Sequence, residues 1–172
     1  MARAQPSPGN AFAGDLLERS AAGYAGFAAS LMLDRDPGLR ERQGPNALVS
    51  WRSHLTQRVL ELAAAVLAGD SRLFLGRVTW SRKAFRARGQ DDQDIRHSIQ
   101  ALRDVLAERL PKPALGLPAE YVDLALQLRL QIRRGGEPRD HDPAHLVDVV
   151  HLHLEVRLGQ AGEAHEVVRV RA

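Results

Sequence analysis

The 172 residues carry a formal net charge of +3, and they are numerous enough for one domain with a hydrophobic core. The absence of cysteine excludes disulfides and thiolate metal sites and fits a reducing compartment, so we expect a cytoplasmic protein. Residues 1–14 lack the apolar segment of a signal peptide, and the longest uncharged stretch, residues 20–33, is too short to span a bilayer. We therefore expect no membrane association.

Scarce aromatic residues mean that the core must be built from Leu, Val and Ala, which favours helix. Residues 1–10 contain Pro and Ser without periodicity, and we predict a disordered tail there. A first helix is predicted over about 11–33. Asp36-Pro37 looks like an N-cap followed by Pro at the first helical position, and it begins a short helix that Gly44-Pro45 ends. The inner face of the first helix is formed by Leu17, Ala21, Tyr24, Ala28 and Leu31.

Four more helices are predicted, over about 47–68, 71–88, 95–110 and from near Pro118 to Arg134. Gly69, Gly89 and Pro111 give their stop signals, and Asp70 caps the second of the four. Short connections between helices of similar length predict an all-α fold, an antiparallel bundle of about five long helices over 11–134. The predicted inward residues are Leu48, Trp51, Leu55, Leu62, Val66, Phe74, Val78, Ser81, Phe85, Ile95, Ile99, Leu102, Leu106, Leu110, Tyr121, Ala125, Leu128 and Ile132.

The C-terminal part supports two readings. Residues 135–142 (GGEPRDHD) are predicted as a linker. In 150–158 apolar and polar residues alternate, a strand pattern that would allow a β-hairpin. Asp142-Pro143 is nevertheless a good helix start, and an isolated hairpin is marginal in water. We predict a helix-turn-helix over 143–172, with the hairpin as the alternative.

Two sets of residues are candidates for ligand or metal binding. Trp51, His54, Trp80 and His97 would line a pocket between helices, since bundle interiors host ligands; the alternative is that the tryptophans only pack and the histidines are partly exposed. In a C-terminal helix, one face would carry the spacing of metal ligands; the alternative is a polar helix face. The residues on that face are His141, His145 and Asp148, with His151 nearby.

A basic stretch surrounds Trp80 and would be the natural nucleic-acid surface. It consists of Arg77, Arg82, Lys83, Arg86 and Arg88. Three aspartates follow at once and offset this charge, so we expect a solvated helix face and no nucleic-acid partner. Neither a Gly-rich phosphate loop nor a Gly-x-Ser-x-Gly elbow occurs in the sequence, and we expect that the chain is not an enzyme.

A set of short motifs over residues 15–134 carries a resemblance to a known family. They are His54-Leu55, Leu62 to Asp70, Leu73-Phe74, Trp80, Arg88-Gly89, Asp91-Asp92 and Leu106 to Pro111. Together they resemble the N-terminal helical region of bacterial cobalamin-binding, corrinoid-protein-like regulatory proteins. The resemblance implies a non-catalytic regulatory or sensor module that acts through protein–protein contacts. It also implies that residues 143–172 look like the start of a helical cap, which precedes a cobalamin-binding α/β domain in that family.

The family's cobalt-ligating Asp-x-His-x-x-Gly motif does not occur in this sequence. We therefore expect no cofactor in this chain, with cobalamin implied only for a full-length family member. A cap cut off from its domain would expose Val150, Leu154 and Val167, which predicts a protein partner or self-association through the C-terminal segment. The alternative function is a small-ligand or metal-binding bundle that uses the interior pocket or the C-terminal histidines.

Overall fold

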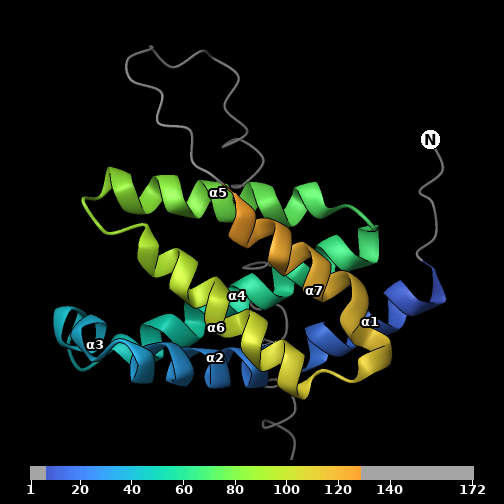
Figure 1. Ribbon diagram of the computed structural model, residues 1–172, viewed down its shortest axis with the longest axis horizontal. Helices are drawn as coiled ribbons and strands as arrows, with labels where there is room; N and C mark the ends of the chain where they lie inside the picture. Colours follow the sequence, from blue (N-terminus) through green and yellow to red (C-terminus); the bar gives the residue numbers. More distant parts are fainter. Residues whose placement is uncertain (1–6, 129–172) are drawn as a thin grey trace, which may run out of the picture. The chain divides into compact units, whose positions relative to one another are not determined.

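The computed structural model describes residues 7–128, and all regular structure in that range is α-helical (Figure 1). The predicted all-α class is thus confirmed for this part of the chain. None of its helices is long and apolar enough to cross a bilayer. The predicted linker and the helix-turn-helix lie outside the described residues. The helices are α1 Pro8–Arg19, α2 Ala21–Arg35, α3 Pro37–Gln43, α4 Ala47–Ala68, α5 Ser71–Ala87, α6 Gln93–Arg109 and α7 Lys112–Gln127.

Local capping residues set the boundaries of α3, α4 and α5 at the positions predicted from the sequence. The side chain of Asp36 accepts a hydrogen bond of 3.0 Å from the backbone N–H of Leu39, and Pro37 begins α3. Helix α4 ends at Gly69, whose φ of 64° is the left-handed conformation that glycine adopts without steric cost. Asp70 then caps α5 by accepting from the N–H of Arg72 at 3.0 Å. The predictions for α3, α4 and α5 are therefore confirmed.

The predicted single helix over 11–33 is wrong, because it is two helices that meet at Ser20. Ser20 has φ −104° and ψ 10°, outside the helical geometry. Helix α1 contacts α4 and α7, whereas α2 contacts α4 and α6, so the break lets each half follow its own partners. The predicted tail is also too long: Ser7 accepts from Asn10 N–H at 3.3 Å, and Pro8 already begins α1.

Helix α7 begins at Lys112, six residues before the predicted start at Pro118. Pro113 lies in the first turn, where a missing N–H leaves no intrahelical bond unmade. Pro118 is buried inside the helix, and it cannot donate to the carbonyl of Ala114 one turn earlier. The predicted start at Pro118 is therefore wrong, because this proline lies buried in the interior of α7. The predicted end at Arg134 and the inward Ile132 lie outside the described residues.

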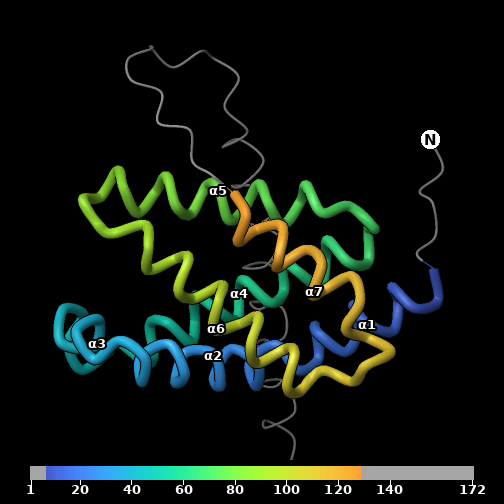
Figure 2. Tube along the Cα trace, in the orientation of Figure 1, coloured from blue at the N-terminus to red at the C-terminus, as the bar shows by residue number. Residues whose placement is uncertain are grey.

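Helix α4 runs through the centre and contacts α1, α2, α5 and α7. Figure 2 shows α5 and α6 diverging from the turn that joins them, with α7 beside both. A uniformly antiparallel bundle therefore stays a prediction. Close helix contact is clearest at Gly14 of α1, where an added Cβ would lie 2.4 Å from Cγ of Leu67.

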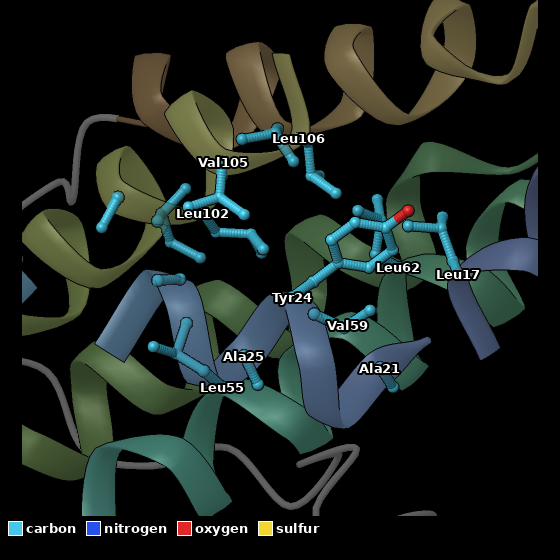
Figure 3. Packing of buried hydrophobic residues seen from close by; sticks show 14 of the residues in the cluster. Leu17, Ala21, Tyr24, Ala25, Leu55, Val59, Leu62, Leu102, Val105 and Leu106 are labelled. Atoms are coloured by element: carbon cyan, nitrogen blue, oxygen red, sulfur yellow. The ribbon is translucent and has the colours of Figure 1, made fainter. Parts of the chain in front are cut away.

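The core lies where α2, α4 and α6 meet, and Figure 3 shows Tyr24, Leu55, Val59 and Leu102 converging there. All five predicted inward residues of α6, including Leu110 at its end, are buried. Leu48 is a wrong prediction: it is 43% exposed, and its neighbour Ala47 occupies the inward position instead. Leu31, Phe85 and Leu128 are partly buried against the core, and the other predicted inward residues in the described range are buried.

Candidate functional site

A cavity of about 460 Å³ opens where α3 and α4 approach the end of α5. Its size falls within the range of small-ligand pockets. Two of the four residues predicted to form a pocket, Trp51 and His54, line it. The remaining lining residues are Arg42, Gln43, Ser50, Phe85 and Gln90. The cavity therefore combines an aromatic wall with several polar side chains.

The aromatic wall is built by helical spacing on two helices. Trp51 and His54 are three residues apart on α4, and their rings meet edge to face with centroids 5.3 Å apart. Phe85 of α5 lies 6.0 Å from each of them. These distances and tilts are typical of favourable aromatic contacts. The three rings therefore hold one another in place without using their polar atoms.

Two polar atoms of this wall lack a hydrogen bond. Trp51 is only 2% exposed, and its indole Nε1 has no partner among residues 7–128. Nε2 of His54 is buried and equally unpaired within that range. Leaving a buried polar group unpaired costs about 1–3 kcal/mol, so nearly all such groups in proteins are paired. Both atoms belong to residues that line the cavity.

The imidazole of His54 is neutral at physiological pH. Burial lowers its pKa from 6.5 to about 4, and the positive charge of Arg58, one turn further along α4, acts in the same direction. A neutral imidazole presents one N–H donor and one acceptor nitrogen. His54 is thus able to give or to accept a hydrogen bond in the cavity.

Arg58 belongs to a buried polar network beneath the cavity. Its guanidinium donates to Glu61 of α4 and to the hydroxyl of Ser81 on α5. Burial lowers the pKa of Arg58; Glu61 opposes this effect and Arg77 adds to it. The sequence could have indicated this site, because Arg58 lies three residues after Leu55 and four before Leu62, on the apolar stripe of α4. The hydrogen bond from Arg58 to Ser81 therefore links α4 to α5 near His54.

A second cluster lies where α2, α3 and the start of α6 meet. Asp36, Asp94 and His97 each bring a ligand atom, and these atoms lie within 4.8 Å of one another. Arg42 of α3 reaches both carboxylates, 3.6 Å from Asp36 and 3.5 Å from Asp94. Arg42 also lines the cavity, so its side chain contacts both the cavity and the carboxylate cluster.

Asp94 is strongly buried, and burial raises the pKa of its carboxyl group. The positive charge of Arg42 opposes this rise without overcoming it, and Asp91 adds to it. Within residues 7–128 its carboxylate accepts no hydrogen bond that would compensate for the lost water. Arg42 is therefore the partner that partly offsets the cost of burying this carboxyl group.

The four residues predicted as one pocket do not come together. Trp51 and His54 do, whereas His97 is exposed and belongs to the carboxylate cluster. Trp80 is 45% exposed and is absent from the cavity lining. Its place is taken by Phe85, which lies five residues further along α5. The predicted metal ligands His141, His145, Asp148 and His151 lie outside the described residues.

Of the three aspartates predicted to offset the basic stretch, only Asp92 pairs with it. Asp92 accepts hydrogen bonds from Arg82 at 2.9 Å and from Arg86 at 2.7 Å. Asp91 and Asp94 act elsewhere: Asp91 accepts from the N–H of Gln93, and Asp94 faces Arg42. Arg82 and Arg86 are thus paired with Asp92, and Arg77 lies 3.9 Å from Glu61 of α4.

Comparisons with known proteins add no relative to these observations. No protein-family model matches the chain, and no curated protein and no solved structure shows significant similarity to it.

Proposed function

We propose that this chain is a non-catalytic, ligand-binding regulatory module. Its cavity takes a small planar molecule that carries hydrogen-bond acceptors. The observation that supports this proposal is the pair of buried, unpaired nitrogen atoms, Nε1 of Trp51 and Nε2 of His54, in an aromatic cavity wall. A bound ligand would relieve the cost of both atoms and so gain affinity from groups that the free protein leaves unsatisfied.

The remaining lining residues define the ligand class further. The rings of Trp51, His54 and Phe85 favour a flat, partly apolar molecule. The indole N–H is a donor only, so the ligand must offer an acceptor. Gln43, Ser50 and Gln90 supply further hydrogen bonds, and Arg42 supplies a positive charge. An aromatic amide or carboxylate matches this combination.

Helix α5 offers a route from the ligand to a protein partner. It contributes Phe85 to the cavity, and it also carries two large apolar side chains in solvent, Leu73 at 51% and Trp80 at 45% exposure. These two are seven residues apart, about two helical turns, and share one stripe. Exposed tryptophans are frequent anchors of protein interfaces. We propose that a protein partner binds this stripe and so responds to changes in the position of α5.

The ligand proposal is tested with benzamide and benzoate as planar probes and cyclohexanecarboxamide as a non-planar control. Saturation-transfer NMR on the full chain detects binding of each probe. The chain has only two tryptophans, so Trp80→Phe leaves Trp51 as the sole tryptophan and serves as the matched control for Trp51→Phe. We expect both planar probes to bind to the wild type and to Trp80→Phe. In Trp51→Phe, benzamide affinity should fall by about five- to tenfold, the effect of one lost hydrogen bond.

Circular dichroism of Trp51→Phe verifies that the ring substitution leaves the fold intact. Equal affinity in Trp51→Phe and wild type would overturn the role of the indole N–H. Absence of binding by both planar probes at millimolar concentration would overturn the proposed ligand class. Stronger binding of benzoate than benzamide would assign a charge contribution to Arg42.

The resemblance to cobalamin-binding regulators leads to a separate prediction. Because the cobalt-ligating motif does not occur in this sequence, hydroxocobalamin titrated into the purified chain should keep its absorption bands unshifted. A stoichiometric shift would make the chain a cobalamin binder, with His54, His97 or the C-terminal histidines as the ligands to test.

A further inference from the structure

We propose that Asp36, Asp94 and His97 bind a divalent transition-metal cation, at a site separate from the aromatic cavity. The cluster combines three donors that such cations accept, two carboxylate oxygens and one imidazole nitrogen. The proposal does not depend on the proposed ligand pocket, because Asp36, Asp94 and His97 are not among the residues that line it.

The geometry of the three donors requires little adjustment. Their ligand atoms lie within 4.8 Å of one another. Ligands about 2.0–2.2 Å from a metal ion lie about 3–4 Å from one another, so closing by roughly 1 Å completes the site. Asp94 and His97 are three residues apart on α6 and share one helix face. Asp36 enters from the junction of α2 and α3; its Oδ1 caps Leu39, while Oδ2 faces the guanidinium of Arg42 at 3.6 Å.

Two further observations point to a ligand. The side chain of Asp94 is 8% exposed, and its charged partner among residues 7–128 is Arg42, whose guanidinium lies 3.5 Å away without donating a hydrogen bond. Buried carboxylates in proteins are normally paired or bind metals. In addition, a cavity of about 280 Å³ is lined by Asp36 and His97, with Met32, Arg35 and Gln100. It leaves space beside two of the three donors, Asp36 and His97, while Asp94 is not part of its lining.

Arg42 is the counter-charge of the metal-free site. Its guanidinium lies 3.5–3.6 Å from both carboxylates and is 57% exposed, so it can leave without losing a buried position. These contacts exceed the usual hydrogen-bond length, and we infer that a divalent cation replaces Arg42 between the carboxylates. Removal of Arg42 should then strengthen metal binding, whereas a purely structural cluster would simply be destabilised.

The test is Zn²⁺ titration by calorimetry in a full-length variant in which His141, His145, His151, His153 and His165 are replaced by Ala. The chain has seven histidines, so this background retains only His54 and His97. We expect one Zn²⁺ per chain. Added His97→Ala or Asp94→Asn should weaken binding at least tenfold, and Arg42→Gln should strengthen it. His54→Ala and Asp123→Asn, which alter a histidine and a carboxylate outside the cluster, are the matched controls.

His97 is exposed, so His97→Ala removes a donor without opening the core. Circular dichroism confirms the fold of each variant. Absence of stoichiometric Zn²⁺ binding in the background would overturn the proposal, as would binding that survives both His97→Ala and Asp94→Asn. Loss of binding in His54→Ala alone would move the metal to the aromatic cavity.

Discussion

Asp92 and Asp94 stand two residues apart at the start of α6, and both are 6% exposed, yet they lie in opposite environments. On the α5 side, Asp92 is held by hydrogen bonds from Arg82 and Arg86. Burial alone would raise its pKa, but these bonds outweigh burial and lower it. On the α3 side, Asp94 faces one arginine, Arg42, at 3.5 Å and accepts no hydrogen bond from it, and burial raises its pKa. A buried charge with good partners supports the fold, whereas one without them is a candidate for function.

Substitution of these two aspartates should distinguish the structural surroundings of Asp92 most clearly from the candidate site around Asp94. Asp92→Asn breaks a buried pair and leaves Arg82 without its carboxylate, so the free energy of unfolding should fall by about 3–5 kcal/mol. Asp94→Asn should change it by less than about 1 kcal/mol, because the environment of Asp94 does not favour its charge. Urea denaturation at pH 7 measures both. Equal losses would show that Asp94 is as structural as Asp92.

The apolar core under α6 gives the reference for a purely structural region. Leu102 and Leu106 are almost fully buried, and truncation of either to Ala should cost about 2–5 kcal/mol. Leu73→Ala on the exposed stripe of α5 is the matched control and should cost less than about 0.5 kcal/mol. Thermal unfolding compares the two. A loss below that of Leu73→Ala would contradict the observed inward face of α6.

The free energy of unfolding should depend on pH through His54 in the wall of the aromatic cavity. His54 has a pKa of about 4 in the folded chain against 6.5 as its ordinary value. Between these values the unfolded chain binds the extra proton, so stability rises from pH 4 to 6.5 and is lost as the pH falls again. The upper limit is about 3 kcal/mol. His54→Phe should remove this part of the pH dependence of the unfolding free energy, while His97→Ala should keep it.

Among the residues of the cavity wall, Trp51 should contribute little to stability. Replacement by Phe removes an unpaired N–H together with some packing, and the two effects oppose each other, so unfolding free energy should change by about 1 kcal/mol or less. Planar-probe binding should nevertheless fall, as proposed above. Chemical denaturation and probe titration on the same sample compare the two. A loss of more than about 3 kcal/mol would assign Trp51 to the structural group.

The sequence by itself determined the helical class and most of the middle boundaries, because those depend on local chemistry. Asp36 and Asp70 cap the next helix, Gly69 ends α4 with a positive φ, and the period of Ile95, Ile99 and Leu102 buries one face of α6. It also brought Trp51 and His54 together, since residues three apart share a helix face.

Only the tertiary structure decided which helices face one another. Periodicity predicts that a helix face is buried but not which helix covers it. The sequence therefore could not show that His97 meets Asp36 and Asp94 and not Trp51. The break at Ser20 and the helical placement of Pro118 follow from packing against neighbours, which outweighs local preference. The pairing of Arg42 with two carboxylates from different elements is of the same kind: it depends on distances between helices, which are set by how their side chains pack together.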